Sequence, residues 1–510
     1  MLDLGRTFLQ SVERRPQRVA IVDGDVRLTY AQWFERIRSA AGGLAGMGLK
    51  LGDHLALALQ NRWEMATLHW ACQFLGVIVT PLNWRAKADE LEYCVADANA
   101  CAIVYEPVSA DAVMGAPACQ TMPRIAVGGA HGGTCVFGQL LEDAPPAQMV
   151  CATAEDFSLM LYTSGTTGRP KGVPRRQRAE RAGALAHVAQ NQYGIGEVTL
   201  GVMPLYHTMG VRSLLAMALV DGTFVCLPRF DAGEALRLIR TEKVSNLYLV
   251  PTLYHDLLAH PDFSGADIST VRRIGFAGAS MNDALLRRLA EAFKPQLFVN
   301  HYGSSEIYTF TIDQQAPARP GSAGRAGFNT RIRVVKLDGG GSNSAPDALA
   351  APGEEGQIIA DLSGDEAFEG YWKRSDADAK ALRAGWYFTG DTGYIDAAGD
   401  LYVTGRVDDM IISGGENISP VDIESVLSFH PAVDEVAVAG MPDARWGQKV
   451  VAFVKAKAAV DAQGLDDYCR SSALPNYKRP REYVFVKAVP KSPVGKILRR
   501  KLVSGEYDKA

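Results

Sequence analysis

The chain has 510 residues, 47% of them hydrophobic and 22% charged, with a formal net charge of −4. This length is too great for one hydrophobic core, so we expect about two to four folding units. The near-neutral charge gives no electrostatic reason to expect nucleic acid or an anionic membrane as the main partner. Asp3 stands where a secretory signal would be basic, and no run reaches the ~18 apolar residues of a membrane span, so we expect a cytoplasmic, unanchored protein.

The first part of the chain alternates amphipathic helices with short apolar strands. The pattern predicts helices over residues 30–44 and 63–75 and strands over residues 55–59 and 77–79. Similar strands are predicted farther along the chain, at residues 200–203, 223–227, 246–250, 273–277 and 296–300. This alternation favours an α/β fold in which helices cover both faces of a mostly parallel sheet, and in which ligands bind at the carboxyl ends of the strands.

The pattern changes in the last third of the chain. After about residue 325, short strands with hairpin-like turns, such as the glycine-rich segment 337–342, predict a small β subdomain. Beyond Gly405, predicted helices at 418–427 and 465–471 alternate with predicted strands at 433–439, 450–454 and 483–486. A compact α+β unit of about 100 residues is typical of an independent domain. We therefore expect a large N-terminal domain, residues 1–405, and a small C-terminal domain, residues 406–510.

One loop, residues 163–172, has the composition of a phosphate-binding loop. Its sequence is Thr-Ser-Gly-Thr-Thr-Gly-Arg-Pro-Lys-Gly, and an apolar segment precedes it. Glycine allows backbone N–H groups to converge on an anion, hydroxyls add donors, and Lys171 adds a positive charge. The loop lies outside the Walker class, because that motif counted from Gly165 requires glycine where this chain has Pro170. Taken alone, the loop is also compatible with a polar surface turn.

Four further segments follow this loop: Asn-His-Tyr-Gly-Ser-Ser-Glu at 300–306, Gly-Trp-Tyr-Phe-Thr-Gly-Asp at 385–391, a glycine-rich stretch at 405–417, and Pro-Lys-Ser-Pro-Val-Gly-Lys at 490–496. In this order the five segments resemble the adenylate-forming superfamily, which comprises acyl-CoA synthetases, peptide-synthetase adenylation domains and luciferases. The closest likeness is to aryl-CoA ligases such as 4-chlorobenzoate–CoA ligase, and it is carried by residues 203–207, 276–279, 405–417, 445–448, 469–472 and 478–480.

The resemblance implies two half-reactions in one site, and it implies roles for three residues at the reacting groups. Glu306 would hold Mg²⁺ on the phosphates of ATP, and Lys496 would bridge the attacking carboxylate and the α-phosphate. His207 would gate the acid pocket, although a core histidine is an alternative. A glutamate or lysine of this kind is also compatible with a helix cap or a solvated charge, so these roles depend on the co-occurrence of the segments.

The resemblance also implies a nucleotide site. Asp391 would accept hydrogen bonds from two ribose hydroxyls with support from Arg406, and Tyr302 would stack on adenine. An aspartate after glycine is by itself more typical of a turn. The residues expected to bind ATP or AMP are Thr163, Ser164, Gly165, Thr166, Thr167, Gly168, Lys171, Gly278, Ala279, Ser280, Asn300, Tyr302, Gly303, Ser304, Ser305, Asp391 and Arg406.

For the second half-reaction, the resemblance implies that the C-terminal domain rotates about a hinge at Asp408. This rotation would withdraw Lys496 and present Gly414 and Gly415 to the pantetheine arm of coenzyme A. Trp446 is the expected platform for the adenine of coenzyme A. The expected phosphate contacts, which are equally compatible with plain surface charges, are Arg85, Arg479 and Arg481.

The acid-binding pocket is the least determined part of the site. The resemblance places around the acid His207, Val211, Tyr248, Gly278, Ser304, Ile307 and Phe310. If the residues after His207 are helical, Val211 shares the face of His207 and Arg212 does not. We therefore expect Val211 rather than Arg212 at the pocket. A role for Arg212 would instead favour a dicarboxylate substrate.

The sequence thus predicts an ATP-dependent carboxylate–CoA ligase for an aromatic or alicyclic acid. The expected cofactors are ATP, Mg²⁺ and coenzyme A, and the resemblance is compatible with a homodimer. Alternatives are a short- or medium-chain fatty acyl-CoA synthetase, a dicarboxylate–CoA synthetase, and a carrier-loading adenylation enzyme, which would need no platform at Trp446. A non-catalytic sensor of ATP or acyl-AMP, binding nucleic acid through residues 496–501, is a further alternative. The presence of Lys496 and Glu306 argues against it.

Overall fold

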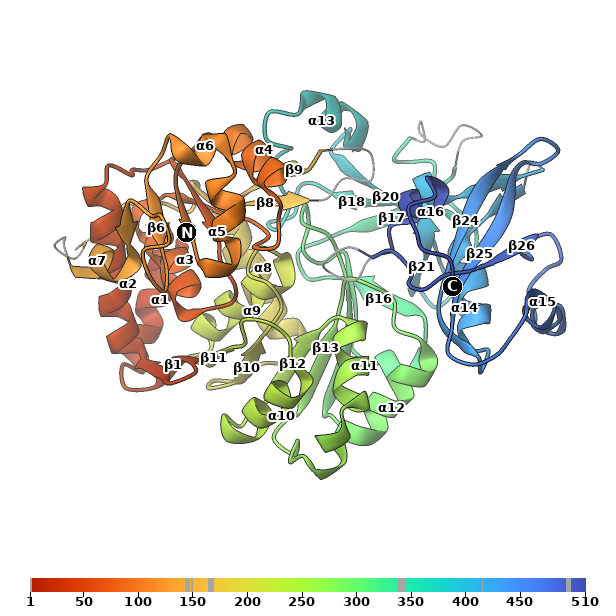
Figure 1. The fold of residues 1–510 in the computed structure, drawn as a ribbon, viewed down its shortest axis with the longest axis horizontal. Coiled ribbons are helices and arrows are strands. Elements are labelled where there is room, and N and C mark those ends of the chain that lie inside the picture. Colours follow the sequence, from red (N-terminus) through yellow and green to blue (C-terminus); the bar gives the residue numbers. More distant parts are fainter. Residues whose placement is uncertain are drawn as a thin grey trace.

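The structure, a computed structural model, describes residues 2–142, 147, 150–163, 169–337, 345–414, 416–491 and 497–510. Within these ranges two large sheets and their helices form one body, and a third, smaller sheet forms a C-terminal unit at its side (Figure 1). The described helices include none long and apolar enough to cross a membrane.

The first sheet has seven strands in the described part of the chain and carries the predicted phosphate-binding loop. Its strands, in spatial order, are β7 (Cys135–Val136), β6 (Arg124–Ala126), β5 (Ala100–Tyr105), β3 (His54–Ala58), β4 (Ile78–Pro81), β8 (Phe157–Thr163) and β9 (Lys171–Arg176). All neighbours are parallel except β8 and β9, which form an antiparallel hairpin. Thr163 pairs with Lys171, so the two ends of the loop are held side by side.

Seven helices precede residue 143 in the described ranges. They are α1 (Leu4–Arg14), α2 (Tyr30–Gly46), α3 (Trp63–Leu75), α4 (Ala88–Ala98), α5 (Pro107–Met114), α6 (Pro117–Gln120) and α7 (Phe137–Glu142). The helices predicted at 30–44 and 63–75 are confirmed. A capping box between Thr29 and Gln32 starts α2, and α3 ends at Gly76, whose φ of 73° suits glycine.

The second sheet, 14-stranded in the described ranges, is parallel in one half and antiparallel in the other. Its strands, in spatial order, are β17 (Ile332–Val335), β18 (Gly356–Asp361), β20 (Trp386–Ile395) with β19 (Leu382–Arg383) beside it, β21 (Leu401–Arg406), β16 (Ser322–Ala326), β15 (Thr311–Asp313), β14 (Leu297–Tyr302), β13 (Arg273–Phe276), β12 (Asn246–Leu249), β10 (Val198–Gly201), β11 (Thr223–Cys226), β1 (Val19–Asp23) and β2 (Val26–Thr29). Strands β14 to β1 are parallel, as predicted. The predicted β subdomain continues this sheet from β15 onward.

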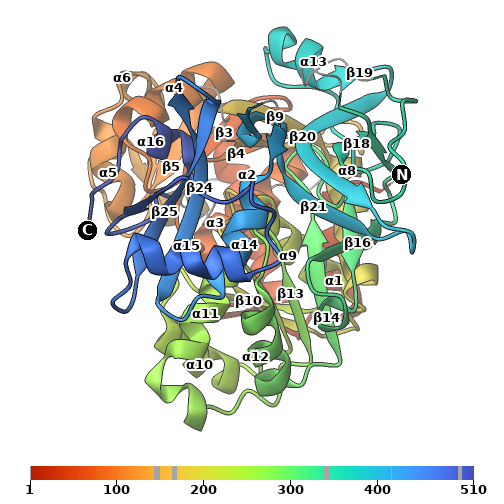
Figure 2. The same ribbon diagram turned by 90° about the vertical axis from the view of Figure 1, so that its right-hand side faces the viewer.

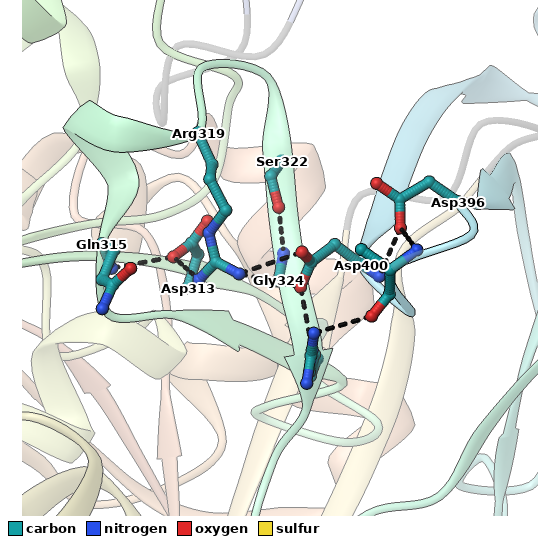
Figure 3. A network of polar contacts seen from close by, with 9 residues as sticks. Asp313, Gln315, Arg319, Ser322, Gly324, Asp396 and Asp400 are labelled. Atoms are coloured by element: carbon teal, nitrogen blue, oxygen red, sulfur yellow. Dashed lines mark hydrogen bonds and ion pairs between the residues drawn. The ribbon is translucent and has the colours of Figure 1, made fainter.

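Ion pairs fix the point where β16 meets β21 (Figure 3). The Arg319 guanidinium lies 2.5 Å from Asp313 and 2.9 Å from Asp400, and Arg325 lies 3.0 Å from the same Asp400 carboxylate. Both carboxylates are buried, so each needs such a partner. The network holds the antiparallel strands that carry Asp391 and Arg406 against the parallel half of the sheet.

Helices cover both faces of the parallel half. On one face lie α8 (Gln177–Gln190) and α9 (Thr208–Leu219), and on the other lie α10 (Ala232–Thr241), α11 (Pro251–Ala259) and α12 (Asp283–Phe293) (Figure 1). The α10–α12 face is apolar, because Leu247, Leu249 and Ile274 pack there in one hydrophobic cluster with leucines of these helices. Side chains alternate along a strand, so Tyr248 and His301 point to the α8–α9 face. Short helices elsewhere are η1 (Pro261–Gly265), η2 (Ala316–Ala318) and α13 (Ser375–Ala381).

The C-terminal unit follows the short helix η3 (Val407–Asp409). Its sheet has the order β23 (Glu416–Ile418), β22 (Ile411–Ser413), β25 (Gly447–Ala456), β24 (Val433–Asp443), with β26 (Glu482–Phe485) parallel to β25. Its helices, seen with the sheet in Figure 2, are α14 (Pro420–Ser428), α15 (Ala462–Ser471) and α16 (Arg499–Val503). The Ser419 hydroxyl donates to the Thr404 carbonyl and ties this unit to the end of β21.

Candidate functional site

A lysine, a tyrosine and a glutamate meet beside the phosphate-binding hairpin. The Tyr371 hydroxyl donates to Oε1 of Glu306 at 2.6 Å, and Nζ of Lys171 lies 3.9 Å from the centroid of the Tyr371 ring. All three side chains are buried or half-buried. Burial lowers the pKa of the Lys171 ammonium, and the Glu306 charge partly offsets this shift. Tyr371 therefore holds the predicted metal-binding carboxylate next to the predicted phosphate-binding lysine.

The backbone around Glu306 is fixed as well. Arg175, fully buried and paired with Glu180 at 2.8 Å, donates to the Glu306 carbonyl at 2.8 Å. The amide of Ser304 donates to the Ile307 carbonyl at 2.9 Å, which closes a tight loop around Glu306. Sequence reasoning missed Tyr371 and Arg175, because neither lies in the five segments and both act across long sequence separations.

Asp391 and Arg406 form the second part of the site. They face each other across β20 and β21, and their side chains lie 2.6 Å apart. The Tyr302 hydroxyl donates to the other Asp391 oxygen at 2.5 Å. Gly390 has a φ of 77°, and a Cβ there would lie 2.7 Å from Arg406 Nη2, so glycine is required. The structure thus brings together three residues that we expected to bind the nucleotide.

The residues expected around adenine lie at the carboxyl ends of β13 and β14. Residues 278–280 are exposed just after β13, and Gly278 has a φ of 83°. Asn300 donates its amide to the Ser322 carbonyl at 2.8 Å. Gly303 follows β14 and packs closely against Tyr308. A Cβ at position 303 would lie 2.1 Å from the Tyr308 carbonyl oxygen, so a larger residue would not fit there. Ser304 and Ser305 are half-buried beside it.

Several predicted residues lie outside the described residues. They are five members of the phosphate loop, one glycine of the C-terminal unit and the predicted catalytic lysine: Ser164, Gly165, Thr166, Thr167, Gly168, Gly415 and Lys496.

His207 is the N-cap of α9. Its Nδ1 accepts from the Met209 amide at 3.5 Å, and its side chain is partly exposed. The neighbouring Tyr206 lies close to Arg85, whose guanidinium stacks 3.6 Å above the Trp84 ring. The structure thus places Arg85 beside the residue that precedes His207.

Arg212 of α9, and not Val211, lies by Tyr248, and the role of Val211 in the acid pocket stays a prediction. The Arg212 guanidinium lies 5.9 Å from the centroid of the Tyr248 ring, whereas Val211 belongs to the hydrophobic core that contains Leu205 and Leu214. A single helix face does not separate the two residues by burial, because α9 is buried on nearly every side. Ile307 and Phe310 are also fully buried, in a cluster with Tyr371 and Tyr387. Of the predicted pocket residues, His207, Gly278 and Ser304 reach the surface.

Trp446 and Gly414 meet in the C-terminal unit. Gly414 has a φ of 61°, its amide donates to the Trp446 carbonyl at 2.9 Å, and a Cβ there would lie 2.8 Å from the indole. Arg445 and Arg481 lie 4.7 and 5.7 Å from the indole centroid. Arg479 instead pairs with Asp466 at 2.8 Å. Of the five residues of this unit predicted to bind coenzyme A, Gly414 and Arg481 therefore lie next to Trp446.

Asp408 lies in η3, which directly follows β21 and joins the two bodies. Its neighbour Asp409 accepts from Arg499 at 3.2 Å. The predicted hinge thus lies in the connection between the large body and the C-terminal unit, and its function as a hinge stays a prediction.

The fold and the site together indicate an adenylate-forming enzyme. The features that indicate it are the hairpin that carries the predicted phosphate loop, the buried Glu306 beside Lys171, and the pair of Asp391 and Arg406. The chain belongs to the AMP-binding enzyme family: the model of that family matches residues 8–372, and the model of the AMP-binding enzyme C-terminal domain matches residues 422–496. It is an AMP-forming acyl-CoA synthetase that uses ATP, Mg²⁺ and coenzyme A.

Individual relatives cover nearly the whole chain. The 4-chlorobenzoate–CoA ligase of an Arthrobacter species is 33% identical over 503 residues, which are 96% of this chain and 93% of the relative. The long-chain-fatty-acid–CoA ligase FadD13 of Mycobacterium tuberculosis is 32% identical over 98% of this chain and 97% of its own. The o-succinylbenzoate–CoA synthetase of Bacillus subtilis, solved with ATP and a magnesium ion, is 27% identical, with a TM-score of 0.82 over 97% of this chain and 98% of its own.

The residues present fit a magnesium ion that arrives with ATP. Magnesium bound to nucleotides typically takes one or two carboxylates, with the remaining ligands from phosphates and water. Glu306 supplies one carboxylate, and Tyr371 occupies only one of its two oxygens among the described residues. No group of three or more His, Cys, Asp or Glu side chains in the described ranges could hold a metal by itself. Glu306 would therefore share the ion with the nucleotide.

Proposed function

We propose that this enzyme activates an aromatic carboxylic acid as its acyl-adenylate and then transfers the acyl group to coenzyme A. The observation that carries the choice of acid is the set of rings on the α8–α9 face of the sheet. His187, Tyr248 and His301 have ring centroids 4.7–5.3 Å apart, and the resemblance puts Tyr248 behind the acid. Flat rings packed in this way suit a flat aromatic substrate.

In the first half-reaction a carboxylate oxygen attacks the α-phosphate of ATP, and the bond to pyrophosphate breaks. Both reactants are anionic, so cationic groups must offset their repulsion. Lys171 would bind the phosphates from the hairpin, and Lys496 would bridge the two reacting groups. Asp391 would accept the ribose hydroxyls, with Arg406 and Tyr302 fixing its carboxylate. When bound, Mg²⁺ disperses the phosphate charge, and Glu306 would hold it there.

In the second half-reaction the thiol of coenzyme A attacks the acyl carbon, and AMP leaves. We propose that rotation about Asp408 withdraws Lys496 and presents the segment around Gly414. Because Gly414 has no side chain, the indole of Trp446 packs directly against the backbone of that segment. Trp446 would stack on the adenine of coenzyme A, while Arg481 and Arg85 would contact its phosphates.

A pyrophosphate-release screen tests the substrate. It compares benzoates, cyclohexane carboxylates, fatty acids and dicarboxylates, each with and without coenzyme A. We expect the highest kcat/KM with a benzoate and thioester only when coenzyme A is present. Highest activity with a fatty acid would contradict the choice of acid, and no pyrophosphate release with any acid would contradict the reaction.

A variant of the predicted catalytic lysine tests the division of the two steps. Lys496→Ala should abolish adenylate formation and still allow a supplied acyl-adenylate to react with coenzyme A. Equal loss of both steps would contradict the proposed role.

Asp408→Pro, which fixes φ at the hinge, should spare adenylation and slow thioester formation. A cytoplasmic location and a homodimer remain predictions for fractionation and sedimentation experiments.

A further inference from the structure

A polar cluster is enclosed between α8, α9 and the sheet. It consists of Arg212 from α9, His187 and Asn191 at the end of α8, and Tyr248 and His301 from the sheet. All five side chains are at most 2% exposed. On the opposite face of the sheet, Leu247, Leu249 and Ile274 pack in a large hydrophobic cluster. Buried polar groups are costly unless each hydrogen-bonding atom has a partner, so such a cluster calls for a reason.

Arg212 fixes the protonation of both histidines. Its Nη2 lies 3.1 Å from Nδ1 of His187 and 3.5 Å from Nδ1 of His301. A guanidinium can only donate, so both Nδ1 atoms accept and both imidazoles carry their proton on Nε2. Burial and the Arg212 charge lower the pKa of both histidines well below the usual value, which keeps them neutral.

Two donors of this cluster have no acceptor among the described residues. Nε2 of His301 lies 3.3 Å from Oδ1 of Asn191, which accepts its proton. Nε2 of His187 and Nε of Arg212, in contrast, are buried without a hydrogen-bond partner in the described ranges. Leaving a buried donor unsatisfied costs roughly 1–3 kcal/mol. Two such donors in one cluster indicate that an acceptor from outside the chain completes it.

The charge of Arg212 also indicates an acceptor from outside the chain. No carboxylate in the described part of the chain lies within 4.0 Å of its guanidinium. Its other contacts are the Tyr308 carbonyl, 2.9 Å from Nη1, and the rings of Tyr308 and Tyr248, each 5.9 Å away. Glu366 contributes an opposing charge from farther away, and burial raises the pKa of this carboxyl. The cluster therefore favours an oxygen acceptor.

The cluster includes Tyr248, which the resemblance places behind the acid. Gly278, at the rim, packs between Val250 and Met209, and Gly275, three residues earlier on β13, packs against Tyr248 and Asn191. Three strand residues span about 10 Å. This span along the chain is similar to the length of a benzoate with a substituent opposite its carboxylate. Arg212 also donates to the carbonyl of Tyr308, which is two residues after Glu306, so the cluster is bonded to the loop that carries the predicted metal-binding residue.

We propose that Arg212 and His187 bind an oxygen acceptor on the substrate, at the end of the ring opposite the reacting carboxylate. The preferred acids would then be benzoates with a 4-nitro or 4-carboxylate group, rather than benzoates with a hydrocarbon group of the same shape. This inference rests on the proposed function and makes Arg212 and His187 specificity-determining residues. The acceptor would occupy the two donors that the chain leaves without partners.

The test measures kcat/KM for pyrophosphate release with 4-nitrobenzoate, terephthalate and 4-isopropylbenzoate, which have similar shapes. We expect one or both acceptor-bearing acids to exceed 4-isopropylbenzoate at least tenfold. A preference for terephthalate alone identifies an anionic acceptor, and a preference for both shows that a neutral oxygen suffices. Equal values for all three overturn the inference. Because 4-isopropylbenzoate would still be activated in that case, the proposed function would survive.

A variant separates recognition from the electronic effect of the substituent. Arg212→Met should reduce the ratio of kcat/KM for an acceptor-bearing acid to kcat/KM for 4-isopropylbenzoate to about one, whatever its effect on 4-isopropylbenzoate alone. A ratio that persists in the variant would overturn the inference. Arg181→Met is the control. Arg181 lies on α8, the helix that carries His187, but it donates to Thr7, so its loss should leave the ratio of the two kcat/KM values unchanged. If Arg212→Met does not fold, His187→Phe, which keeps the ring beside Tyr248, gives the same comparison.

Discussion

The hydroxyl of Tyr371 offers a direct test of how this site holds Glu306, its predicted metal-binding carboxylate. Tyr371→Phe removes the donor that lies 2.6 Å from Glu306 Oε1 and keeps the ring that lies 3.9 Å from Lys171 Nζ. A hydrogen bond to a charged group contributes about 1.5–3 kcal/mol, and a desolvated cation–π contact can contribute about 2 kcal/mol. The substitution therefore isolates the first contribution and preserves the second.

We expect Tyr371→Phe to slow adenylate formation about ten- to a hundredfold, because about 1.4 kcal/mol in the barrier corresponds to a factor of ten. The reaction of a supplied acyl-adenylate with coenzyme A should stay within twofold of wild type, since that step does not release pyrophosphate. Single-turnover pyrophosphate release at saturating ATP and varied Mg²⁺ measures the first step, and thioester formation by chromatography measures the second.

Two control variants make the result decisive. Tyr254→Phe removes another fully buried hydroxyl, which donates to the carbonyls of Leu247 and Gly275 at 3.0 and 2.8 Å. It should lower the free energy of unfolding and leave adenylation unchanged. Tyr371→Leu should be slower than Tyr371→Phe, because it also removes the contact with Lys171. An adenylation rate in Tyr371→Phe within twofold of wild type would refute the view that this hydroxyl positions Glu306.

Three further predictions concern other parts of the chain. Gly414→Ala should slow thioester formation and lower the melting temperature more than Gly399→Ala. Both glycines have a positive φ, but only at Gly414 would an added Cβ lie 2.8 Å from the indole of Trp446. Equal effects of the two substitutions would contradict this prediction. Trp446→Ala should raise the KM for coenzyme A and leave that for ATP unchanged, and an unaltered coenzyme A KM would exclude the platform. Burial lowers the pKa of His54 and His69 to about 4, so the unfolded chain binds more protons as pH falls from about 6.5 to 4, and stability should fall in that window. Urea denaturation should show a shallower pH slope in His69→Gln, by up to about 1.4 kcal/mol per pH unit, and an identical slope would refute the assignment.

Local patterns in the sequence were sufficient for much of the fold. The helix over residues 63–75 is observed at those bounds, because its residues are helix-compatible and Gly76 ends it with a positive φ. The predicted strands at 223–227 and 246–250 are observed within one residue, as short apolar runs between turns. The order of the five segments was sufficient to identify the family. Each of these signals lies within a few consecutive residues.

The sequence by itself determined the elements, the parallel arrangement of the strands and the class of reaction, because periodicity, turn residues and contiguous motifs are local properties. Only the tertiary structure decided that Arg212 faces Tyr248, since α9 is buried all round and its pattern does not single out one face. The tertiary structure also decided that Tyr371 holds Glu306 across 65 residues and that Tyr302 holds Asp391 across 89. Such contacts depend on how distant strands and loops pack together, which no local pattern encodes.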